Sequence, residues 1–372
     1  MMNEKIFSIN KIRKYLKKKG FNISQKKTAN EENDTGNIAR TFLASLIIIS
    51  FFFISPIVVE FIKTTPFTSV DFENNSKNSL KKLLEKKDGK SDVVVNRKFL
   101  FDDILTFDEE PNDSVRLSAA TIEELFKSTN YSLDDVRKNK LVKPISLTLL
   151  PSEIKKIINT KKRKDFFIQI ILPLVIKENN HIRLDRKKLF SILNKSKNTR
   201  VEQVWLNLKF KEYGVVNKDL STLKIRMDEI PASMTIAQAA KETGWGTSRF
   251  AQEGNALFGQ WTWDGEGIKP SEADNGSTHK VMKFKVLQAS IRAYQRNLNT
   301  HPSYENFRIA RAELRDEGKK LDSITLSRYL DKYAETGKEY IKVIHQIIKQ
   351  NNLTDFDDAK LLPSSISLES LI

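Results

Sequence analysis

The stretch PASMTIAQAAKETGWGTSRFAQEGNALFGQWTWDGEG, residues 231–267, carries the pattern that decides the fold of this chain. Closely spaced alanines favour a helix, Pro231 suits its first turn, and Gly244 is placed to end it. Glu242 therefore falls in the last turn. We expect a short helix that presents one acidic side chain at its carboxyl end.

Glu242 shares a polar stripe with Thr235 and Gln238, and this stripe points away from the apolar side of the helix. The negative end of the helix dipole and the neighbouring Trp245 both disfavour ionisation, so we expect a raised pKa for Glu242. A carboxyl that stays protonated near neutral pH is what a glycosidase needs as its general acid. These features alone also fit a solvated surface glutamate beside a core tryptophan.

Three of the four tryptophans of the chain, Trp245, Trp261 and Trp263, fall within nineteen residues. Flat apolar rings with a polar edge suit stacking on sugars, and they also suit an ordinary core. The intervening NALFGQW contains Gly259, which permits an unusual backbone conformation or a close approach. We expect this segment to form a structured loop along one wall of a cleft.

Two strings carry a resemblance to a known family. AAKETGWG (239–246), followed by NALFG (255–259), resembles the signature of the glucosaminidase domain family, which includes peptidoglycan-cleaving autolysins. FGQW and the later NLNTHP (297–302) resemble the Bax-like branch of that family. The resemblance covers about residues 226–352.

The resemblance implies a fold, an activity and a set of site residues. The implied fold is α+β and mainly helical, with a lysozyme-like catalytic domain and a small β-lobe. The implied activity is that of an endo-β-N-acetylglucosaminidase, which cleaves between N-acetylglucosamine and N-acetylmuramic acid, with Glu242 matching the general acid. Tyr333 resembles the family tyrosine whose hydroxyl could hold an acetamido group or water; this chain has Tyr-Ala-Glu-Thr where many relatives have Tyr-Ala-Thr-Asp. The expected substrate-binding residues are Trp245, Asn255, Phe258, Gln260, Trp261 and Asp274.

A glycosidase with two carboxylates needs a second acid, and residues 264–276 offer several among glycines. This polar stretch is expected to be a β-hairpin loop that faces the cleft. Glu272 is the preferred candidate because EADNG resembles the acidic-Asn-Gly element that follows the catalytic-lobe glutamate of the family. Asp274 and Glu266 remain alternatives, and so does participation by the acetamido group of the substrate.

The formal charge of +16 is concentrated in the first two thirds of the chain. Residues 226–372 are neutral, with 20 Lys and Arg against 20 Asp and Glu, whereas residues 1–40 carry ten basic and four acidic side chains. A nucleic-acid-binding function is therefore disfavoured, because a basic flank beside an apolar segment explains the charge. The absence of cysteine excludes disulfides, thiolate metal sites and a cysteine nucleophile.

Residues 41–59 form an apolar run of nineteen residues without a charge, which can be extended to residue 62. At 1.5 Å per residue such a run spans a hydrocarbon core of about 30 Å. We predict one transmembrane helix over 41–62; a cleaved signal peptide is the alternative. Because the basic tail precedes this helix, the positive-inside rule predicts a cytoplasmic tail and an exported catalytic domain at the inner membrane of a bacterium.

The predicted organisation has six parts: a basic cytoplasmic tail (1–40), a transmembrane anchor (41–62), a juxtamembrane linker (63–100), a helical accessory region (101–225), a glucosaminidase-like catalytic domain (226–355) and a C-terminal tail (356–372). Within the accessory region, the apolar run 166–176 is too short to span a membrane. It predicts a buried helix that is kinked or stopped at Pro173. Further helices are predicted at 185–194 and 199–212.

The sequence therefore predicts a membrane-anchored peptidoglycan hydrolase whose partner is the glycan strand. No cofactor or metal is expected, since the four histidines are scattered without ligand spacing. A muramidase or a lytic transglycosylase is an alternative enzyme, because both also use a glutamate at a helix end. A catalytically silent wall-binding scaffold is an alternative of another class.

Overall fold

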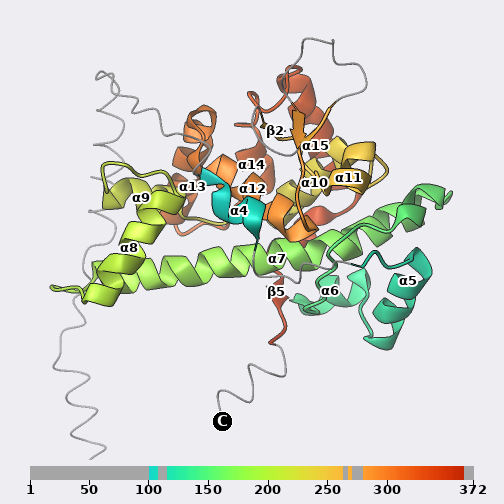
Figure 1. Ribbon diagram of the computed structural model, residues 1–372, viewed down its shortest axis with the longest axis horizontal. Coiled ribbons are helices and arrows are strands. Elements are labelled where there is room, and N and C mark those ends of the chain that lie inside the picture. Colours follow the sequence, from blue (N-terminus) through green and yellow to red (C-terminus); the bar gives the residue numbers. More distant parts are fainter. Residues whose placement is uncertain (1–99, 108–114, 263–266, 270–279, 364–372) are drawn as a thin grey trace, which may run out of the picture. The chain divides into compact units, whose positions relative to one another are not determined.

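The computed structural model describes residues 100–107, 115–262, 267–269 and 280–363, which all lie in the unit Phe72–Ile372 (Figure 1). The predicted tail and transmembrane segment, and nearly all of the predicted linker, lie outside the described residues. Among the helices that are described, none combines the length and the apolar character needed to cross a bilayer.

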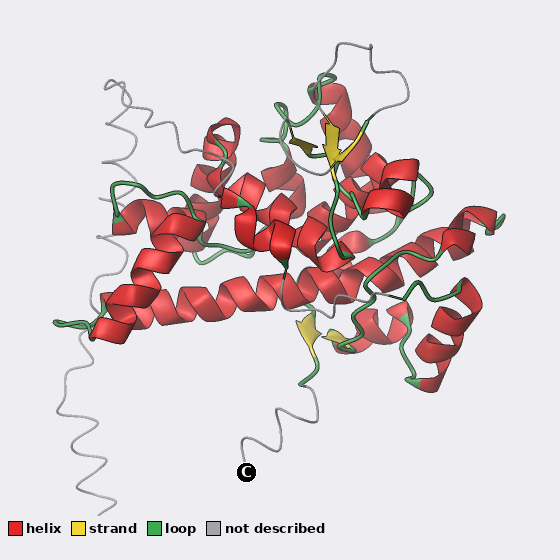
Figure 2. Ribbon diagram, viewed as in Figure 1, coloured by secondary structure: helices red, strands yellow, loops and turns green. Residues whose placement is uncertain are grey.

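The described part is mainly helical with small sheets, as predicted (Figure 2). In chain order its elements are α4 (Asp102–Thr106), α5 (Ala119–Ser128), α6 (Leu133–Asn139), β1 (Leu141–Val142), η3 (Ser152–Lys156), α7 (Thr160–Leu193), α8 (Arg200–Glu212), α9 (Leu220–Arg226), α10 (Ala232–Thr243), α11 (Arg249–Gly254), β2 (Trp261–Thr262), β3 (Gly267–Ile268), β4 (Lys280–Met282), α12 (Leu287–Thr300), η4 (Pro302–Tyr304), α13 (Glu305–Asp316), α14 (Ser323–Ser327), α15 (Lys338–Gln350), η5 (Leu353–Phe356) and β5 (Lys360–Leu361).

Helix α7 has 34 residues and is longer than predicted. It contains the buried run 166–176 as expected and continues through Pro173, which excludes the predicted stop at that residue and leaves the predicted kink untested. The predicted separate helix 185–194 corresponds to its carboxyl-terminal part. An interior proline costs about 3 kcal/mol. Its neighbours Leu172 and Leu174 are fully buried, and each such side chain contributes about 1.5 to 3 kcal/mol. Burial on both sides of the proline therefore outweighs the lost hydrogen bond.

The core is built where α7 packs against α10 and α12 (Figure 1). One continuous set of buried side chains runs from Ile122 on α5 through Phe167 on α7 to Ile236 on α10 and Phe356 in η5. Residues of the predicted accessory region and of the predicted catalytic domain thus share one hydrophobic core. Residues before and after position 226 in the sequence therefore both support the helix that carries Glu242.

Two small sheets complete the fold. The strand order β2-β4-β3 forms an antiparallel sheet in which Val281 lies opposite both Trp261 and Ile268. β1 and β5 pair in parallel, with Leu141 opposite Lys360, so that a segment after the last helix returns to a segment before α7. The first sheet follows α11 directly and corresponds to the predicted β-lobe.

Candidate active site

The helix that carries Glu242 begins and ends as the sequence predicts, and its first turn is capped by a residue from a distant segment. α10 follows Pro231 and ends at Gly244, which adopts a left-handed conformation (φ 55°). No side chain of its own amino-terminal segment caps α10. Asp357, 124 residues further along, accepts hydrogen bonds from the backbone N–H of Ser233 (2.8 Å) and from its hydroxyl (2.7 Å). A distant segment thus satisfies hydrogen-bond donors in the first turn of this helix.

The polar stripe of α10 is buried rather than solvated. Thr235 and Gln238 are fully buried. Gln238 accepts a hydrogen bond from the hydroxyl of Tyr294, and its amide donates to the hydroxyl oxygen of Tyr340 (3.0 Å). Buried polar groups are tolerated when they are hydrogen-bonded. The stripe therefore forms a connected polar network inside the core, which leads to Glu242.

Glu242 lies in the last turn of α10 and is half-buried. Its Oε1 accepts a hydrogen bond from the Tyr340 hydroxyl (3.0 Å). A Cβ added to Gly259 would lie 3.8 Å from Oε2, so this glycine leaves space beside the carboxyl that any other residue would fill. Burial raises the pKa of Glu242, and the hydrogen bond from Tyr340 and the charge of Lys241 oppose this shift.

The direction of the predicted pKa shift is confirmed, and its cause is mainly burial. The ring of Trp245 packs against Phe167 in a T-shaped arrangement (centroids 6.0 Å apart), with the Lys164 ammonium over its face. Burial and the neighbouring charge of Glu242 raise the pKa of Tyr340. Tyr340 therefore keeps its proton at neutral pH and acts as the hydrogen-bond donor of this pair.

Tyr333 packs against Tyr340, the tyrosine that hydrogen-bonds the acid, and the substrate-site role that the resemblance implies for it stays a prediction. Its ring stacks on Tyr340 with centroids 5.4 Å apart, and its hydroxyl donates to the backbone carbonyl of Phe258 (3.0 Å). Phe258 is buried and stacks on Tyr294 at 4.0 Å. The Tyr333 hydroxyl thus holds the loop after α11 in place, and its oxygen retains acceptor capacity.

Three further expected binding residues lie in or next to the loop after α11. Asn255 shapes this loop, whereas Gln260 and Trp261 are partly exposed. Asn255 is buried in a left-handed conformation (φ 51°), and its amide donates to the carbonyls of Phe284 (3.0 Å) and Lys285 (3.1 Å). Gln260 is half-buried, and its Oε1 has no hydrogen-bond partner among the described residues. Trp261 is 46% exposed on β2.

Glu272 and Asp274 lie outside the described residues, as do Trp263, Asp264 and Glu266. The strands on either side of residues 270–279 are described, and β3 and β4 pair antiparallel, as a hairpin connection requires. The position of a second carboxylate stays a prediction. Within the described ranges, no cluster of three or more His, Asp or Glu side chains is arranged to hold a metal ion.

Sequence reasoning missed Tyr340, the only described side chain that hydrogen-bonds the Glu242 carboxyl. Tyr340 stands in register with Ile344 and Ile348, the two fully buried isoleucines of α15. That i, i+4, i+8 spacing marks the buried face of the helix, so the sequence does carry a signal that Tyr340 points inward. What it points at depends on the packing of α15 against α10.

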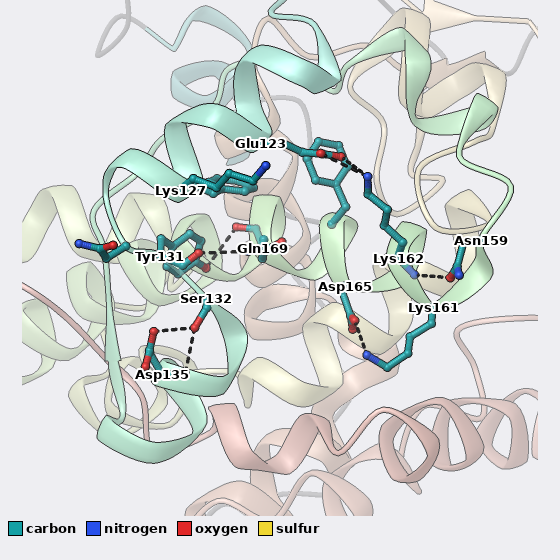
Figure 3. Close-up of a pocket in the computed structure, with 13 residues that line it drawn as sticks. Glu123, Lys127, Tyr131, Ser132, Asp135, Asn159, Lys161, Lys162, Asp165 and Gln169 are labelled. Atoms are coloured by element: carbon teal, nitrogen blue, oxygen red, sulfur yellow. Dashed lines mark hydrogen bonds and ion pairs between the residues drawn. The ribbon is translucent and has the colours of Figure 1, made fainter.

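A cavity beside the amino-terminal half of α7 is a separate feature. Its volume is about 690 Å³, and it is lined by α5, α6 and α7 (Figure 3). Its charges neutralise one another: Lys162 pairs with Glu123 (2.9 Å) and Lys161 with Asp165 (3.0 Å). None of the predicted site residues lines it. The candidate active site is therefore the neighbourhood of Glu242.

Comparisons with known proteins agree with this geometry. The family model described as mannosyl-glycoprotein endo-beta-N-acetylglucosaminidase matches residues 222–353, which include α10, the loop after α11 and Tyr340. Protein bax of Escherichia coli (strain K12) is 30% identical over 205 residues, which are 54% of this chain and 73% of that protein.

A solved structure, the catalytic domain of the autolysin Auto from Listeria monocytogenes, is also similar in part. It is 20% identical, and the match covers 47% of this chain and 97% of that one, with a TM-score of 0.26. At that score the likeness carries no argument about the site. The signature on α10 and its following loop, together with the relative aligned over nearly three quarters of its length, places this chain in the glucosaminidase family of glycoside hydrolases, in its Bax-like branch.

Proposed function

We propose that this chain is a peptidoglycan hydrolase of the endo-β-N-acetylglucosaminidase type, with Glu242 as its general acid. The observation that carries the proposal is the half-buried Glu242 carboxyl with a raised pKa, oriented by the Tyr340 hydroxyl beside the space at Gly259. A carboxyl with a raised pKa keeps its proton to higher pH than a free one, which suits a general acid. The family match supports N-acetylglucosamine as the sugar whose bond is cut.

In the proposed reaction, protonated Glu242 transfers its proton to the glycosidic oxygen while the bond from that oxygen to C1 breaks. The oxygen leaves as a hydroxyl group on the neighbouring sugar. A water molecule supplies the new hydroxyl group at C1, and its proton passes to a base. Glu272 is the proposed base or stabilising carboxylate, with Asp274 and Glu266 as alternatives. The products are two shorter glycan strands, one of which ends in a reducing N-acetylglucosamine.

Three side chains near the acid are proposed to bind the sugar. Trp261 offers an exposed ring for stacking on a pyranose face. Gln260 has an acceptor oxygen without a partner among the described residues, which an acetamido N–H would satisfy. The Tyr333 hydroxyl donates one hydrogen bond to the carbonyl of Phe258, and its oxygen can also accept a hydrogen bond from the substrate.

We also propose that residues 41–62 anchor the chain as a single transmembrane helix, with the catalytic domain on the extracytoplasmic side. The support is the apolar run after a basic tail in the sequence. This arrangement would put the hydrolase where peptidoglycan is found. Protease accessibility of the catalytic domain in spheroplasts tests it: protection from external protease would contradict the proposal.

Digestion of purified peptidoglycan by the full chain in detergent tests the activity. Wild type is compared with Glu242→Gln and with Glu253→Gln, which changes an exposed glutamate on α11. Released fragments are reduced with borohydride and identified by mass spectrometry. Reduced N-acetylglucosamine ends from wild type and Glu253→Gln, but not from Glu242→Gln, are expected.

Other fragment patterns would contradict the proposal in distinguishable ways. Reduced muramic acid ends would identify a muramidase, and anhydromuramic acid ends would identify a lytic transglycosylase. Equal activity of Glu242→Gln and wild type would remove Glu242 from the reaction. Wall binding without cleavage by wild type would identify a scaffold.

A further inference from the structure

Helix α8 is apolar on two sides, and only one of them is covered. Leu206 and Phe210 are buried in a cluster with the carboxyl-terminal part of α7. Val201, Val204 and Leu208 are 75%, 54% and 60% exposed. Their i, i+3, i+7 spacing puts these three side chains on one stripe of the helix, which we call the α8 face.

The surroundings of the α8 face are strongly basic. Residues 183–226 hold twelve Lys and Arg against four Asp and Glu. The two carboxylates of α8 are already engaged, Glu202 by Lys195 and Glu212 by Lys209 and Arg296. Exposed basic side chains without a carboxylate partner among the described residues are Lys187, Lys197, Arg200, Lys211 and Lys218.

An aromatic side chain stands at the edge of the α8 face. Trp205 is half-buried, one turn from both Val201 and Leu208. The ammonium groups of Lys188 and Lys209 lie 4.8 Å and 5.8 Å from the centre of its ring. An apolar stripe with a tryptophan at its edge and lysines around it is the composition of a helix that lies in a membrane interface.

The point where the chain enters the described fold lies close to α8. Arg296 on α12 donates to the backbone carbonyl of Leu100 (3.0 Å) and pairs with Glu212 at the end of α8 (2.8 Å). One side chain therefore joins the first described residue to this helix. The apolar run 41–62 ends only 37 residues before Leu100, so a membrane that holds that run keeps α8 at high effective concentration near its surface.

We propose that the α8 face docks on the surface of an anionic phospholipid bilayer. Val201, Val204 and Leu208 enter the interface, Trp205 lies at the headgroup level, and the surrounding Lys and Arg side chains contact the headgroup phosphates. Docking orients the catalytic unit on the membrane rather than leaving it at the end of a free linker. The proposal rests on the proposed membrane anchor and is independent of which glycosidic bond is cut.

The absence of cysteine in the chain permits a direct test with single labels. Val204→Cys or Leu208→Cys in the full chain is labelled with an environment-sensitive nitrobenzoxadiazole dye and reconstituted into phosphatidylglycerol-containing vesicles that include brominated lipid. The matched control is Ile158→Cys, which is 94% exposed. It precedes α7, whose 34 residues place it about 50 Å from α8.

We expect the dye at positions 204 and 208 to shift to shorter wavelength and to be quenched several-fold more than at 158. The difference should disappear in purely zwitterionic vesicles. Equal quenching at 204 and 158 would overturn the proposal. A label at Ser45→Cys separates this result from failure of the anchor, since it must be quenched whenever the anchor is inserted.

A second copy of the chain on the α8 face would give a different result. The dye at 204 would shift without bromine quenching, and Val204→Cys chains would form disulfide-linked dimers under oxidation. That outcome would also overturn the proposal.

The variant Val204→Asp with Leu208→Asp changes only exposed side chains. The dye is placed on Val201→Cys in two proteins, one with and one without these two substitutions. We expect bromine quenching of the dye in the protein without them and its loss in the protein with them.

Discussion

The hydroxyl of Tyr340 on α15 lies 3.0 Å from Oε1 of Glu242 on α10, and it is the donor in this hydrogen bond. The same hydroxyl oxygen accepts from the amide of Gln238. Tyr340 therefore fixes the orientation of the carboxyl and stabilises its ionised form. Burial acts in the opposite direction, and it is the larger effect on the pKa of Glu242.

Replacement of Tyr340 by Phe should move the alkaline limb of the kcat–pH profile to higher pH. The hydrogen bond from Tyr340 lowers the pKa of Glu242, so its loss raises that pKa further and keeps the acid protonated at higher pH. The unfolding free energy should fall by about 1 to 3 kcal/mol because the buried Gln238 amide loses an acceptor. Tyr329→Phe, at an exposed tyrosine, is the control. A limb that stays in place or moves to lower pH would contradict the assignment.

Glu242→Gln should be more stable than wild type at alkaline pH. The pKa of Glu242 is raised in the folded state by burial. Its contribution to stability is therefore fully present below the unfolded pKa of about 4.3 and is lost as pH rises through the folded pKa. The amide does not titrate and can still accept from Tyr340. Thermal unfolding across this pH range measures the difference between the two proteins, which should grow with pH; a constant difference would argue against a raised pKa.

Gly259→Ala should reduce activity beyond its effect on stability. Gly259 has φ 60°, and an added Cβ would lie 3.8 Å from Oε2 of Glu242, in the space beside the acid. Gly318→Ala is a matched control, since Gly318 has φ 66° and open space around the added atom. Each variant should lose about 1 to 2 kcal/mol to backbone strain. Only Gly259→Ala should lower kcat/KM at a temperature where both remain folded, and equal activities would show that this space is not used.

Asp357→Asn should remove a pH dependence of stability. Burial raises the pKa of Asp357 from 3.8 to about 6, although two hydrogen bonds from Ser233 oppose the shift. The stabilising contribution is fully present below about pH 4 and is lost as pH rises through about 6, at most about 3 kcal/mol. Asn does not titrate, so the stability difference between variant and wild type should change between these pH values. Asp358→Asn, at an exposed neighbour that pairs with Lys320, should keep this pH dependence and move its midpoint to slightly lower pH, because the charge of Asp358 contributes to the raised pKa of Asp357.

The local features of the site were predictable from the sequence. The start of α10, its end at Gly244 and the position of Glu242 in the last turn follow from helix propensity and capping rules that act over a few residues. The buried face of α15 follows from periodicity in the same way. Each of these features depends on residues within one or two helical turns of one another.

The side chains that hydrogen-bond Glu242 and the first turn of α10 were not predictable because they come from distant segments. Tyr340 is 98 residues from Glu242, and Asp357 is 124 residues from Ser233. Only the packing of α15 and the segment after it against α10 brings them together. Whether the helix continues past Pro173 or stops there was left open by the sequence for a related reason, since burial by α10 and α12 decides it and local propensity opposes it.

The cap that Asp357 supplies to α10 also bears on the order in which the protein can form. During synthesis, Glu242 and its helix leave the ribosome more than a hundred residues before Asp357. Until that aspartate emerges, the first turn of α10 has no side-chain partner, and β1 has no β5 with which to pair. Folding of the described domain is therefore completed from its carboxyl-terminal side. A chain interrupted between Tyr340 and Asp357 would contain both Glu242 and Tyr340, but the helix that carries Glu242 would lack the cap on its first turn.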